Sequence, residues 1–360
     1  MKPKVYIWLV LFWINGFCLS SLFAQEQASS FDPEKSRTLR VMFYNVENAF
    51  DTVNAPTAGD DEFTPGGIRR WNWYKYRNKI DKMYKVIVAA GGWEPPGLVG
   101  FCEVESRKIL EDLVHHTPFS KYQYKIIHNE SPDFRGIDVA AIYREDKFQP
   151  AGFRYISVPL AKQFESTRDI LYIKGIVPSS DTLHIFFNHW PSRWQGALHS
   201  RPKRIKAAQI LRYHIDSLLR KNPEAFMVVA GDFNDTPESV SLVKYLKAEN
   251  AQNSIKSDKL YNLSRHWEKL SYGSYKYQGV WEIFDQFIVS GNLLTPNSGL
   301  HTSPQNAHIM LTPFLVTEDE KYTGTKPFRT YSGYRYIGGF SDHLPIILDL
   351  HQHQPGGSRY

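Results

Sequence analysis

Polar side chains that could bind a metal or move a proton follow the apolar segments of this 360-residue sequence. Five of them come at the carboxyl ends of predicted strands: Asn45, Glu103, His189, Asp232 and Asn234. A further pair, Asp342 and His343, directly precedes the last predicted strand. Carboxylates on the rim of an apolar sheet are costly unless something compensates their charge. Because carboxylate and amide oxygens suit a hard divalent cation, the pattern predicts a site for Mg²⁺, with Mn²⁺ or Ca²⁺ as alternatives.

Each of these motifs also has a purely structural interpretation when it is considered alone. Asp232 and Asn234 could form an Asx turn or cap a helix, since a Pro-Glu pair follows them. Glu103 could lead into a helix, where the helix dipole stabilises a carboxylate. The occurrence of all the motifs in one chain, in this order, favours a single functional site.

The hydrophobic pattern predicts the elements that must position these side chains. Short β-branched and aromatic runs predict strands at 39–44, 98–101, 122–128, 139–143, 170–177, 183–188, 225–230, 281–289 and 344–350. Helical periodicity predicts helices at 74–90, 107–116, 202–220 and 239–249. Several consecutive strands leave no room for a crossover helix, which favours mixed or antiparallel sheets with helices packed outside. The stretch 290–340, rich in Gly, Pro, Ser and Tyr, is predicted to be a long loop that is either functional or mobile.

The composition favours a folded protein and excludes a disordered one. Hydrophobic residues make up 42% of the chain and aromatic residues 14%, enough apolar surface to offset the entropy of ordering it. The formal net charge is +6, to which Lys2 and Lys4 contribute two. So mild an excess favours no class of partner by itself. Cys102 lies in an apolar run and is expected to be a buried thiol.

The first 24 residues have the layout of a secretory signal peptide: two lysines, an apolar run at 5–14 and small residues before Gln25. The alternative is an amino-terminal membrane anchor, but Asn15 and Gly16 interrupt the run, and a spanning helix needs about 20 apolar residues. We expect cleavage after Ala24 and an exported mature chain, periplasmic or extracellular, without a membrane span. The expected organisation is a signal peptide at 1–24, a flexible spacer at 25–38, one folded domain at 39–351 and a tail at 352–360.

Taken together, five motifs resemble those of the endonuclease/exonuclease/phosphatase superfamily, which includes deoxyribonuclease I and the neutral sphingomyelinases. They are YNVEN at 44–48, GFCEVE at 100–105, NHWPSR at 188–193, GDFN at 231–234 and SDH at 341–343. The resemblance covers about residues 40–350. It implies an α/β (α+β) fold, a four-layered sandwich of two mixed, mainly antiparallel β-sheets packed face to face with helices outside. Cys102 departs from the family pattern, in which Gln commonly precedes the metal-binding Glu, and we expect it to alter hydrogen bonds around the metal ligands.

The resemblance also implies a metal-dependent hydrolase, in which a metal-activated water attacks the phosphorus of a phosphate ester. Glu103 is then the principal metal ligand, with Asn45 in or beside the coordination shell and Asp342 as a further ligand. His343 is the expected general base, and Asp285 is the carboxylate that orients its ring.

The remaining residues implied by the resemblance act on the substrate. Asp232 positions or activates the nucleophile, and Asn234 donates its amide to the developing oxyanion. His189 binds the scissile phosphate or assists the leaving group, with Asp138 as a candidate to orient it. Two arginines are expected to face substrate phosphates, although a surface position or the polar face of a helix would also explain them: Arg168 and Arg193.

The leading hypothesis from the sequence is an exported endonuclease, a phosphodiesterase whose substrate is nucleic acid. The mild net charge keeps open a phosphomonoesterase or a sphingomyelinase-type enzyme acting on inositol phosphates or phospholipid headgroups. A non-catalytic binding module on the same scaffold is a remote alternative, because decay would have removed some of the expected site residues. The sequence indicates no obligate protein partner.

Overall fold

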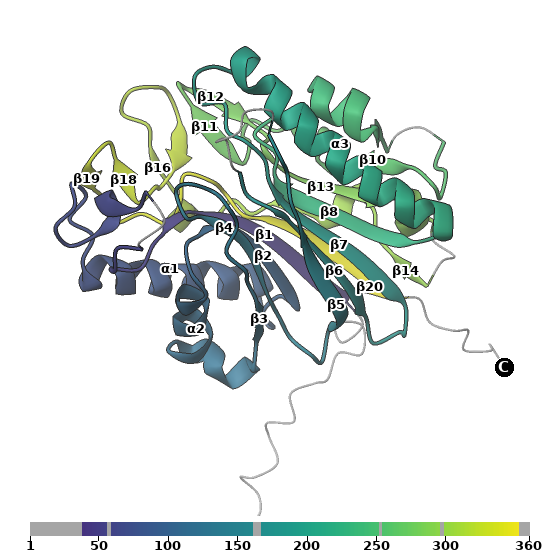
Figure 1. The fold of residues 1–360 in the computed structure, drawn as a ribbon, viewed down its shortest axis with the longest axis horizontal. Helices are drawn as coiled ribbons and strands as arrows, with labels where there is room; N and C mark the ends of the chain where they lie inside the picture. Colours follow the sequence, from purple (N-terminus) through teal and green to yellow (C-terminus); the bar gives the residue numbers. More distant parts are fainter. Residues whose placement is uncertain (1–37, 56–58, 161–166, 252–253, 296–298, 353–360) are drawn as a thin grey trace, which may run out of the picture. The chain divides into compact units, whose positions relative to one another are not determined.

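Two seven-stranded β-sheets packed face to face form the centre of the chain (Figure 1). This computed structural model describes residues 38–55, 59–160, 167–251, 254–295 and 299–352. The predicted signal peptide at 1–24 therefore lies outside the described residues, as do 25–37 of the spacer and 353–360 of the tail. Within the described ranges, no helix combines the length and the apolar character needed to cross a membrane.

The first sheet has the order β14-β20-β1-β2-β4-β3, and β15 also pairs with β20. Its strands are β1 (Thr38–Ala49), β2 (Leu98–Val104), β3 (Lys125–Ile127), β4 (Asp138–Tyr143), β14 (Leu300–His301), β15 (Ala307–Ile309) and β20 (Ile346–Gln352). The central strands β1 and β2 are parallel, whereas β4 is antiparallel to both of its neighbours. The carboxyl ends of β1 and β2 consequently lie at the same edge of this sheet.

The second sheet has the order β5-β6-β7-β8-β13-β10-β9. Its strands are β5 (Gln149–Ile156), β6 (Ile170–Ile176), β7 (Thr182–His189), β8 (Phe226–Asp232), β9 (Ala248–Asn250), β10 (Leu260–Asn262) and β13 (Asp285–Ser290). Here β7 and β8 are parallel, and β13 runs antiparallel to β8. The carboxyl ends of β7 and β8 therefore meet the amino end of β13.

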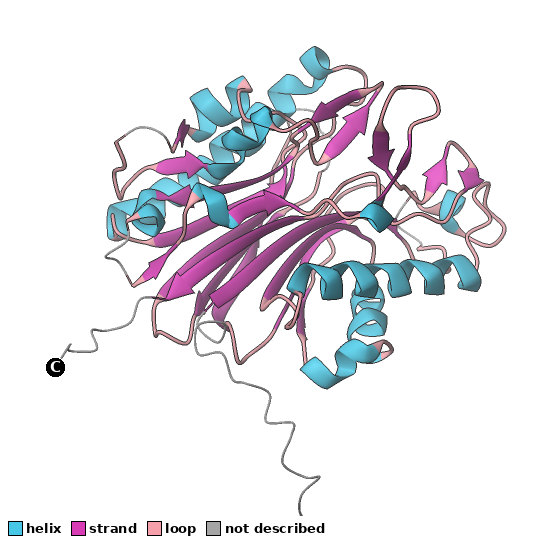
Figure 2. Ribbon diagram, turned by 180° about the vertical axis from the view of Figure 1, so that it is seen from behind, coloured by secondary structure: helices cyan, strands magenta, loops and turns pink. Residues whose placement is uncertain are grey.

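Helices cover the outer face of each sheet and complete four layers (Figures 1 and 2). Helices α1 (Trp73–Gly91) and α2 (Arg107–His115) cover the first sheet, and α3 (Ala197–Lys221) covers the second. Helix α1 begins where the side chain of Asn72 accepts a hydrogen bond from the backbone N–H of Lys75. This arrangement confirms the predicted α/β sandwich of two mixed sheets with helices outside.

Three two-stranded hairpins extend from one edge of the sandwich. They are β11 (Tyr275–Tyr277) with β12 (Val280–Glu282), β16 (Val316–Glu318) with β17 (Thr325–Pro327), and β18 (Tyr331–Ser332) with β19 (Arg335–Tyr336). The stretch 290–340, predicted as a long loop, thus contains short strands and 3₁₀ turns in its described residues. Short polar strands such as these carry too few alternating residues to be recognised by periodicity.

Two further predictions of secondary structure are wrong in detail. The predicted helix at 239–249 is a short π-helix, η4 (Ser241–Leu246), followed by β9. It ends at Lys247, whose φ of 60° is left-handed and stops the helix. The predicted strand at 281–289 is two strands, β12 and β13, because the chain breaks its pairing between them. Strand β5 was missed, since its largely exposed residues lie on the edge of the second sheet.

The interface between the sheets is close at Gly100, where no side chain larger than hydrogen fits. The ring of Phe187 on β7 packs there and stacks on Phe43 of β1, with ring centroids 6.1 Å apart. A Cβ atom at position 100 would lie 2.3 Å from two carbons of the Phe187 ring. Glycine at this position therefore sets how closely the two sheets approach.

We expect Gly100→Ala to lower the free energy of unfolding by about 1–3 kcal/mol, the usual effect of overpacking a core. The matched control is Gly152→Ala on the edge strand β5, where nothing lies within 4 Å of the added Cβ. Urea denaturation of the two variants measures the difference. Equal midpoints for Gly100→Ala and the parent protein would contradict this account of the interface.

A histidine at the interface of β6 and β7 makes stability depend on pH. His184 lies opposite Lys174, and its Nδ1 lies 2.7 Å from the hydroxyl of Tyr172. Burial, and then the charge of Lys174, lower the pKa of His184 to about 4. Between the ordinary histidine pKa of about 6.5 and about 4, the unfolded chain therefore takes up a proton that the folded protein does not.

We expect the free energy of unfolding to fall as the pH drops through that window, and His184→Gln to reduce this loss. The exposed His199 on α3 provides the control, because His199→Gln removes a histidine but leaves His184 in place. Urea midpoints measured above and below the window compare the three proteins. The same pH dependence in all three would exclude His184 as its source.

Candidate active site

The ends of five strands from both sheets bring the predicted site residues together. Asn45 lies opposite Cys102 in the β1–β2 pair of the first sheet. In the second sheet, Asp232 at the end of β8 lies opposite His189 of β7 on one side and Asp285 of β13 on the other. The topology therefore explains why residues far apart in the sequence meet at one edge of the sandwich.

Asp232 is the centre of this cluster. Its Oδ2 accepts a hydrogen bond from Asn45 Nδ2 at 3.1 Å, so this contact joins the two sheets. The same Oδ2 lies 3.7 Å from His189 Nε2 and 3.8 Å from His343 Nε2. Its Oδ1 accepts the backbone N–H of Asn234 at 2.9 Å. Burial, with a contribution from the charge of Asp285, raises the pKa of Asp232 to about 7.

His343 and Asp285 form a buried hydrogen-bonded pair beside Asp232. The His343 Nδ1 lies 2.7 Å from Asp285 Oδ2. Burial opposes a charge on the imidazole, but the carboxylates of Asp285 and Asp232 more than offset it, so the pKa of His343 is raised well above its ordinary value. Asp285 is itself fixed by a hydrogen bond from its backbone N–H to the hydroxyl of Ser274. The hydrogen bond to Asp285 therefore fixes the orientation of the His343 ring, and Nε2 faces the site.

A β-bulge directs Glu103 into the same region. The register between β1 and β2 shifts after the Asn45–Cys102 pair, and Glu103 has a φ of 64° there. A bulge of this kind redirects a side chain. The backbone N–H of Asn48 donates to Glu103 Oε2 at 2.9 Å, and Glu103 Oε1 lies 3.8 Å from His189 Nε2. Glu103 and Asp232, which come from different sheets, therefore both approach His189 Nε2.

Asp342, expected from the sequence to be a further metal ligand, lies in a second group of charges together with Glu47 and Arg329. Arg329 binds it through Nη2 at 2.9 Å and approaches Glu47 through Nε at 3.3 Å. Glu47 also accepts the backbone N–H of Thr330 at 2.6 Å. Burial, and then the charge of Asp342, raise the pKa of Glu47 to about 7. Glu47 was visible in the YNVEN motif, and Arg329 in the basic and aromatic segment that precedes the SDH motif, but no local pattern pairs the two residues.

Lys79 of α1 was also missed, and its buried ammonium interacts electrostatically with these carboxylates. Its Nζ donates to Thr330 Oγ1 and to the carbonyl of Phe340, both at 2.8 Å. Burial lowers its pKa to about 8, although the carboxylates of Glu47, Asp342 and Glu103 act in the opposite direction. A lysine within an amphipathic helix is normally exposed, so the sequence gave no reason to place it here.

The predicted phosphate-facing arginines are both engaged in ion pairs. Arg168 is buried, with Nη1 3.1 Å from Asp133 Oδ2 and Nη2 2.8 Å from the carbonyl of Trp190. Arg193 binds Glu282 at 3.0 Å and donates through Nε to the carbonyl of Asn234. Both arginines flank the strand ends that carry the cluster, and neither lies free on the surface.

His189 is held differently from the prediction. Asp138 does not orient it, because the Asp138 carboxylate lies 3.1 Å from His128 Nε2 and accepts the backbone N–H of Ser131. Instead, His189 Nδ1 is buried without a hydrogen-bond partner among the described residues. Burial lowers the pKa of His189 well below its ordinary value, so the ring is neutral. Asn234 donates through Nδ2 to the carbonyl of Trp190 at 3.0 Å, which fixes its amide beside the cluster.

Most of the chain matches one family. A family model described as "Endonuclease/Exonuclease/phosphatase family" matches residues 40–352. The chain belongs to the endonuclease/exonuclease/phosphatase family. As a member, it is a metal-dependent phosphoric ester hydrolase. A search of curated proteins finds no significant match.

Solved structures of the family share the fold at low sequence identity. Humanised TDP2 of D. rerio is 13% identical with a TM-score of 0.53, over 88% of this chain and 100% of that one. The catalytic domain of human Nocturnin, with a bound sulfate anion, is 14% identical with a TM-score of 0.53, over 88% and 95% of the two chains. A family protein from Bacteroides thetaiotaomicron is 14% identical with a TM-score of 0.52, over 88% and 98%.

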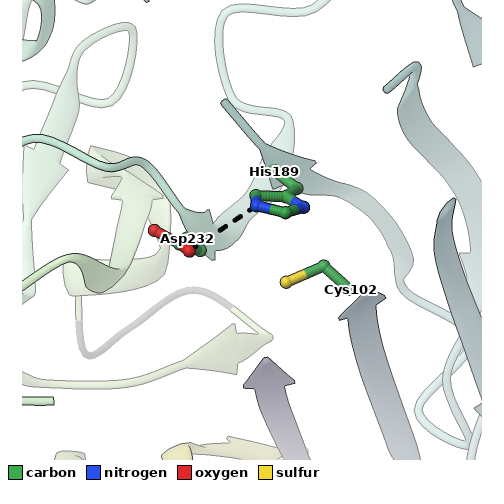
Figure 3. A group of neighbouring side chains, drawn as sticks. All are labelled: Cys102, His189 and Asp232. Atoms are coloured by element: carbon green, nitrogen blue, oxygen red, sulfur yellow. Dashed lines mark ion pairs between the residues drawn. The ribbon is translucent and has the colours of Figure 1, made fainter. Parts of the chain in front are cut away.

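The residues of the cluster fit the divalent cation on which the family depends. In the part of the chain that the structure describes, two groups of three side chains bring ligand atoms within 4.8 Å of one another: Cys102, His189 and Asp232 (Figure 3), and Asp232, Asp285 and His343. The thiol of Cys102 is a poor ligand for a hard ion, because burial and the charge of Asp232 raise its pKa well above its ordinary value. In the second group, His343 Nδ1 is hydrogen-bonded to Asp285, so this nitrogen is not free to bind a metal.

Oxygen donors remain for the cation around those two groups. Glu103 and Asp232 approach from the two sheets, and Asn45, at the end of β1, contacts Asp232. The buried Oδ1 of Asp285 has no hydrogen-bond partner among the described residues. Buried carboxylates this close need positive charge to compensate them, and carboxylate and amide oxygens are the donors that Mg²⁺, Mn²⁺ and Ca²⁺ prefer. Asp342 would reach such an ion only by sharing its carboxylate with Arg329.

Proposed function

We propose that this family member is an exported, Mg²⁺-dependent phosphodiesterase that cleaves nucleic acid as an endonuclease. The observation that carries the proposal is the convergence of Glu103, His189, Asp232 and His343 at one edge of the sandwich. This arrangement offers metal ligands, a base and neutral donors around one point, as hydrolysis of a phosphodiester requires. One structure with this fold, D. rerio TDP2, was determined in complex with a single strand DNA product.

Glu103 and Asn45 would hold the cation, with Asp342 as a further candidate. When bound there, it would polarise a phosphoryl oxygen and compensate the charge that builds up in the transition state. His343 removes a proton from the attacking water through Nε2, while Asp285 keeps the opposite nitrogen protonated and stabilises the resulting imidazolium. Asp232, between the two histidines, positions the water.

The neutral groups of the site act on the phosphate itself. His189 is neutral and donates to a phosphate oxygen or to the leaving oxygen. Asn234 supports the developing oxyanion after its amide leaves the carbonyl of Trp190, and donors of this kind contribute on the order of 10²- to 10³-fold in rate. Arg168 and Arg193 flank the site but stay paired with Asp133 and Glu282, so they hold its walls in place and supply no free positive charge.

An activity panel with the purified mature protein and Mg²⁺ tests the proposal. The substrates are supercoiled plasmid DNA, a single-stranded oligonucleotide, a choline phospholipid and an inositol phosphate. We expect internal cleavage of nucleic acid, which nicks the plasmid and shortens the oligonucleotide. The inactive Glu103→Gln variant, purified in parallel, controls for contaminating nucleases. Hydrolysis of only the phospholipid or the inositol phosphate would overturn the nuclease proposal in favour of the alternative enzymes.

Export is tested separately on the full chain. We propose that the segment 1–24 is removed during secretion, as its three-part layout indicates. Mass spectrometry of the protein recovered outside the cytoplasm of an expressing bacterium is expected to give an amino terminus at Gln25. Retention of Met1 in a cytoplasmic product would contradict export.

A further inference from the structure

A cavity of about 270 Å³ lies beside the proposed catalytic site. Its lining residues come from three separate parts of the chain: Glu47, Asn48, Phe63, Arg69, Arg329, Thr330, Tyr331 and Gly333. Figure 1 shows the same proximity, with the hairpin β18–β19 next to the purple segment that follows β1. We call this cavity the aromatic pocket.

The aromatic pocket shares residues with the metal site. The backbone N–H of Asn48, in the pocket wall, donates to Glu103 Oε2 at 2.9 Å. Arg329 lines the pocket and binds Asp342 at 2.9 Å. The pocket therefore lies next to the residues expected to bind the phosphate, where a group attached to that phosphate could enter it.

The inner wall of the pocket is a guanidinium in contact with the aromatic rings of Phe63, Tyr331 and Tyr334. Arg69 Cζ lies 4.8 Å from the ring centroid of Phe63 and 5.0 Å from that of Tyr331. Its Nη1 donates to the carbonyl of Gly333 at 3.2 Å, and the backbone carbonyl of Arg69 accepts a hydrogen bond from the Tyr331 hydroxyl at 3.0 Å. An arginine plane held in this way is a surface on which a nucleic acid base stacks.

The two arginines of the aromatic pocket already form ion pairs, and this limits which ligands the pocket can bind. Arg69 Nε lies 2.8 Å from Glu62, and Arg329 is shared between Glu47 and Asp342. Neither arginine is free to bind a second phosphate, and the tetrahedral ammonium of a choline headgroup has no planar face to stack on a guanidinium. An inositol ring has no planar face to stack on the guanidinium. A neutral, planar group fits the chemistry of these walls.

The size of the pocket limits the occupant further. Ligand sites for drug-sized molecules occupy about 300–1,000 Å³, so 270 Å³ has room for one ring system and not for stacked base pairs. A base can enter only if it is unpaired and unstacked, as bases in single strands are.

We propose that the aromatic pocket binds the base of the nucleotide next to the scissile phosphate, which makes single-stranded nucleic acid the preferred substrate. This inference rests on the proposed nuclease function and narrows its substrate. The base stacks on Arg69 while its phosphate lies at Glu103 and His189. A duplex would have to lose one base pair before it could bind in the same way.

A single-stranded oligonucleotide with one abasic site tests the pocket without any variant. Cleavage at one of the two phosphates that flank the abasic site is expected to fall about tenfold relative to the intact oligonucleotide, in line with the loss of one base stack. The same sequence as a duplex is expected to have a KM about tenfold higher, with a smaller change in kcat. Equal cleavage of single strand, duplex and both abasic flanks would overturn the inference.

The variant Arg69→Ala is expected to remove the effect of the abasic site and to raise KM for the intact strand. Arg154→Ala is the matched control, since Arg154 lies over the ring of Tyr172 at 5.0 Å on the distant strand β5. Arg69→Lys keeps the charge without the planar surface and is expected to behave as Arg69→Ala does. A persisting abasic effect in folded Arg69→Ala would exclude the pocket. Failure to cleave any nucleic acid would instead exclude the proposed function.

Discussion

The variant Glu103→Gln is expected to lose both metal binding and hydrolysis. A carboxylate that ligates the cation contributes several kcal/mol to the transition state, so kcat/KM should fall by about 10³-fold or more. The change removes one negative charge while leaving the shape of the side chain and its contact with Asn48 nearly intact. Calorimetric titration with Mg²⁺ or Mn²⁺ measures binding, and hydrolysis of the best substrate measures activity.

Glu105, two residues further along, is the matched control. Burial raises its pKa to about 9, so its carboxyl is protonated at neutral pH and Glu105→Gln changes no charge there. Its Oε2 accepts the backbone N–H of Asp51, which a glutamine can still satisfy. We expect Glu105→Gln to retain the metal affinity and most of the activity. Normal Mg²⁺ affinity in Glu103→Gln would show that this carboxylate is not a ligand.

The second large effect is expected for the pair His343 and Asp285. Loss of a general base lowers rates by about 10²- to 10⁴-fold, so His343→Ala should lower kcat by that amount. Asp285→Asn should have a similar effect, because the Asp285 carboxylate is hydrogen-bonded to His343 Nδ1 at 2.7 Å and stabilises the charge on the ring. In the double variant the losses should not add, since the two residues act as a unit.

The pH dependence of kcat/KM separates a role of Asp285 in tuning the base from a purely structural role. The carboxylates of Asp285 and Asp232 raise the pKa of His343, and the base must be neutral to accept a proton. In Asp285→Asn, the acidic limb of kcat/KM should therefore move to lower pH. The control is His116→Ala, which breaks a similar contact of 2.8 Å with Asp112 on the surface of α2. An unchanged acidic limb in Asp285→Asn would contradict the assignment.

The strand ends of the site could be predicted because the pattern is local. An apolar run that stops at an Asn, Asp, Glu or His places that side chain at the edge of a sheet, whatever the tertiary structure. Parallel pairing then brings two such ends together, as in β1–β2 and in β7–β8. The fold class was accessible for the same reason, since consecutive strands without crossover helices limit the topology.

The charged groups around Asp342 could not be predicted, because their roles depend on long-range packing. In the sequence, Lys79 cannot be told from an exposed helical lysine, because its partners Thr330 and Phe340 lie 251 and 261 residues away. Arg329 binds Glu47 across 282 residues of sequence, and no local pattern connects them. Asp138 was assigned to the wrong histidine for a related reason. Its partner His128 is only ten residues away and has no motif of its own.

The division of the site between two sheets ties turnover to assembly of the entire sandwich. Asn45 and Glu103 belong to the first sheet, whereas His189, Asp232 and Asp285 belong to the second. Strand β20, which follows His343, returns from the far end of the chain to join the first sheet. A polypeptide cut between β4 and β5 would thus yield two inert fragments. Recovery of hydrolysis on mixing them would report that both halves had docked, and could serve as an assay for complementation.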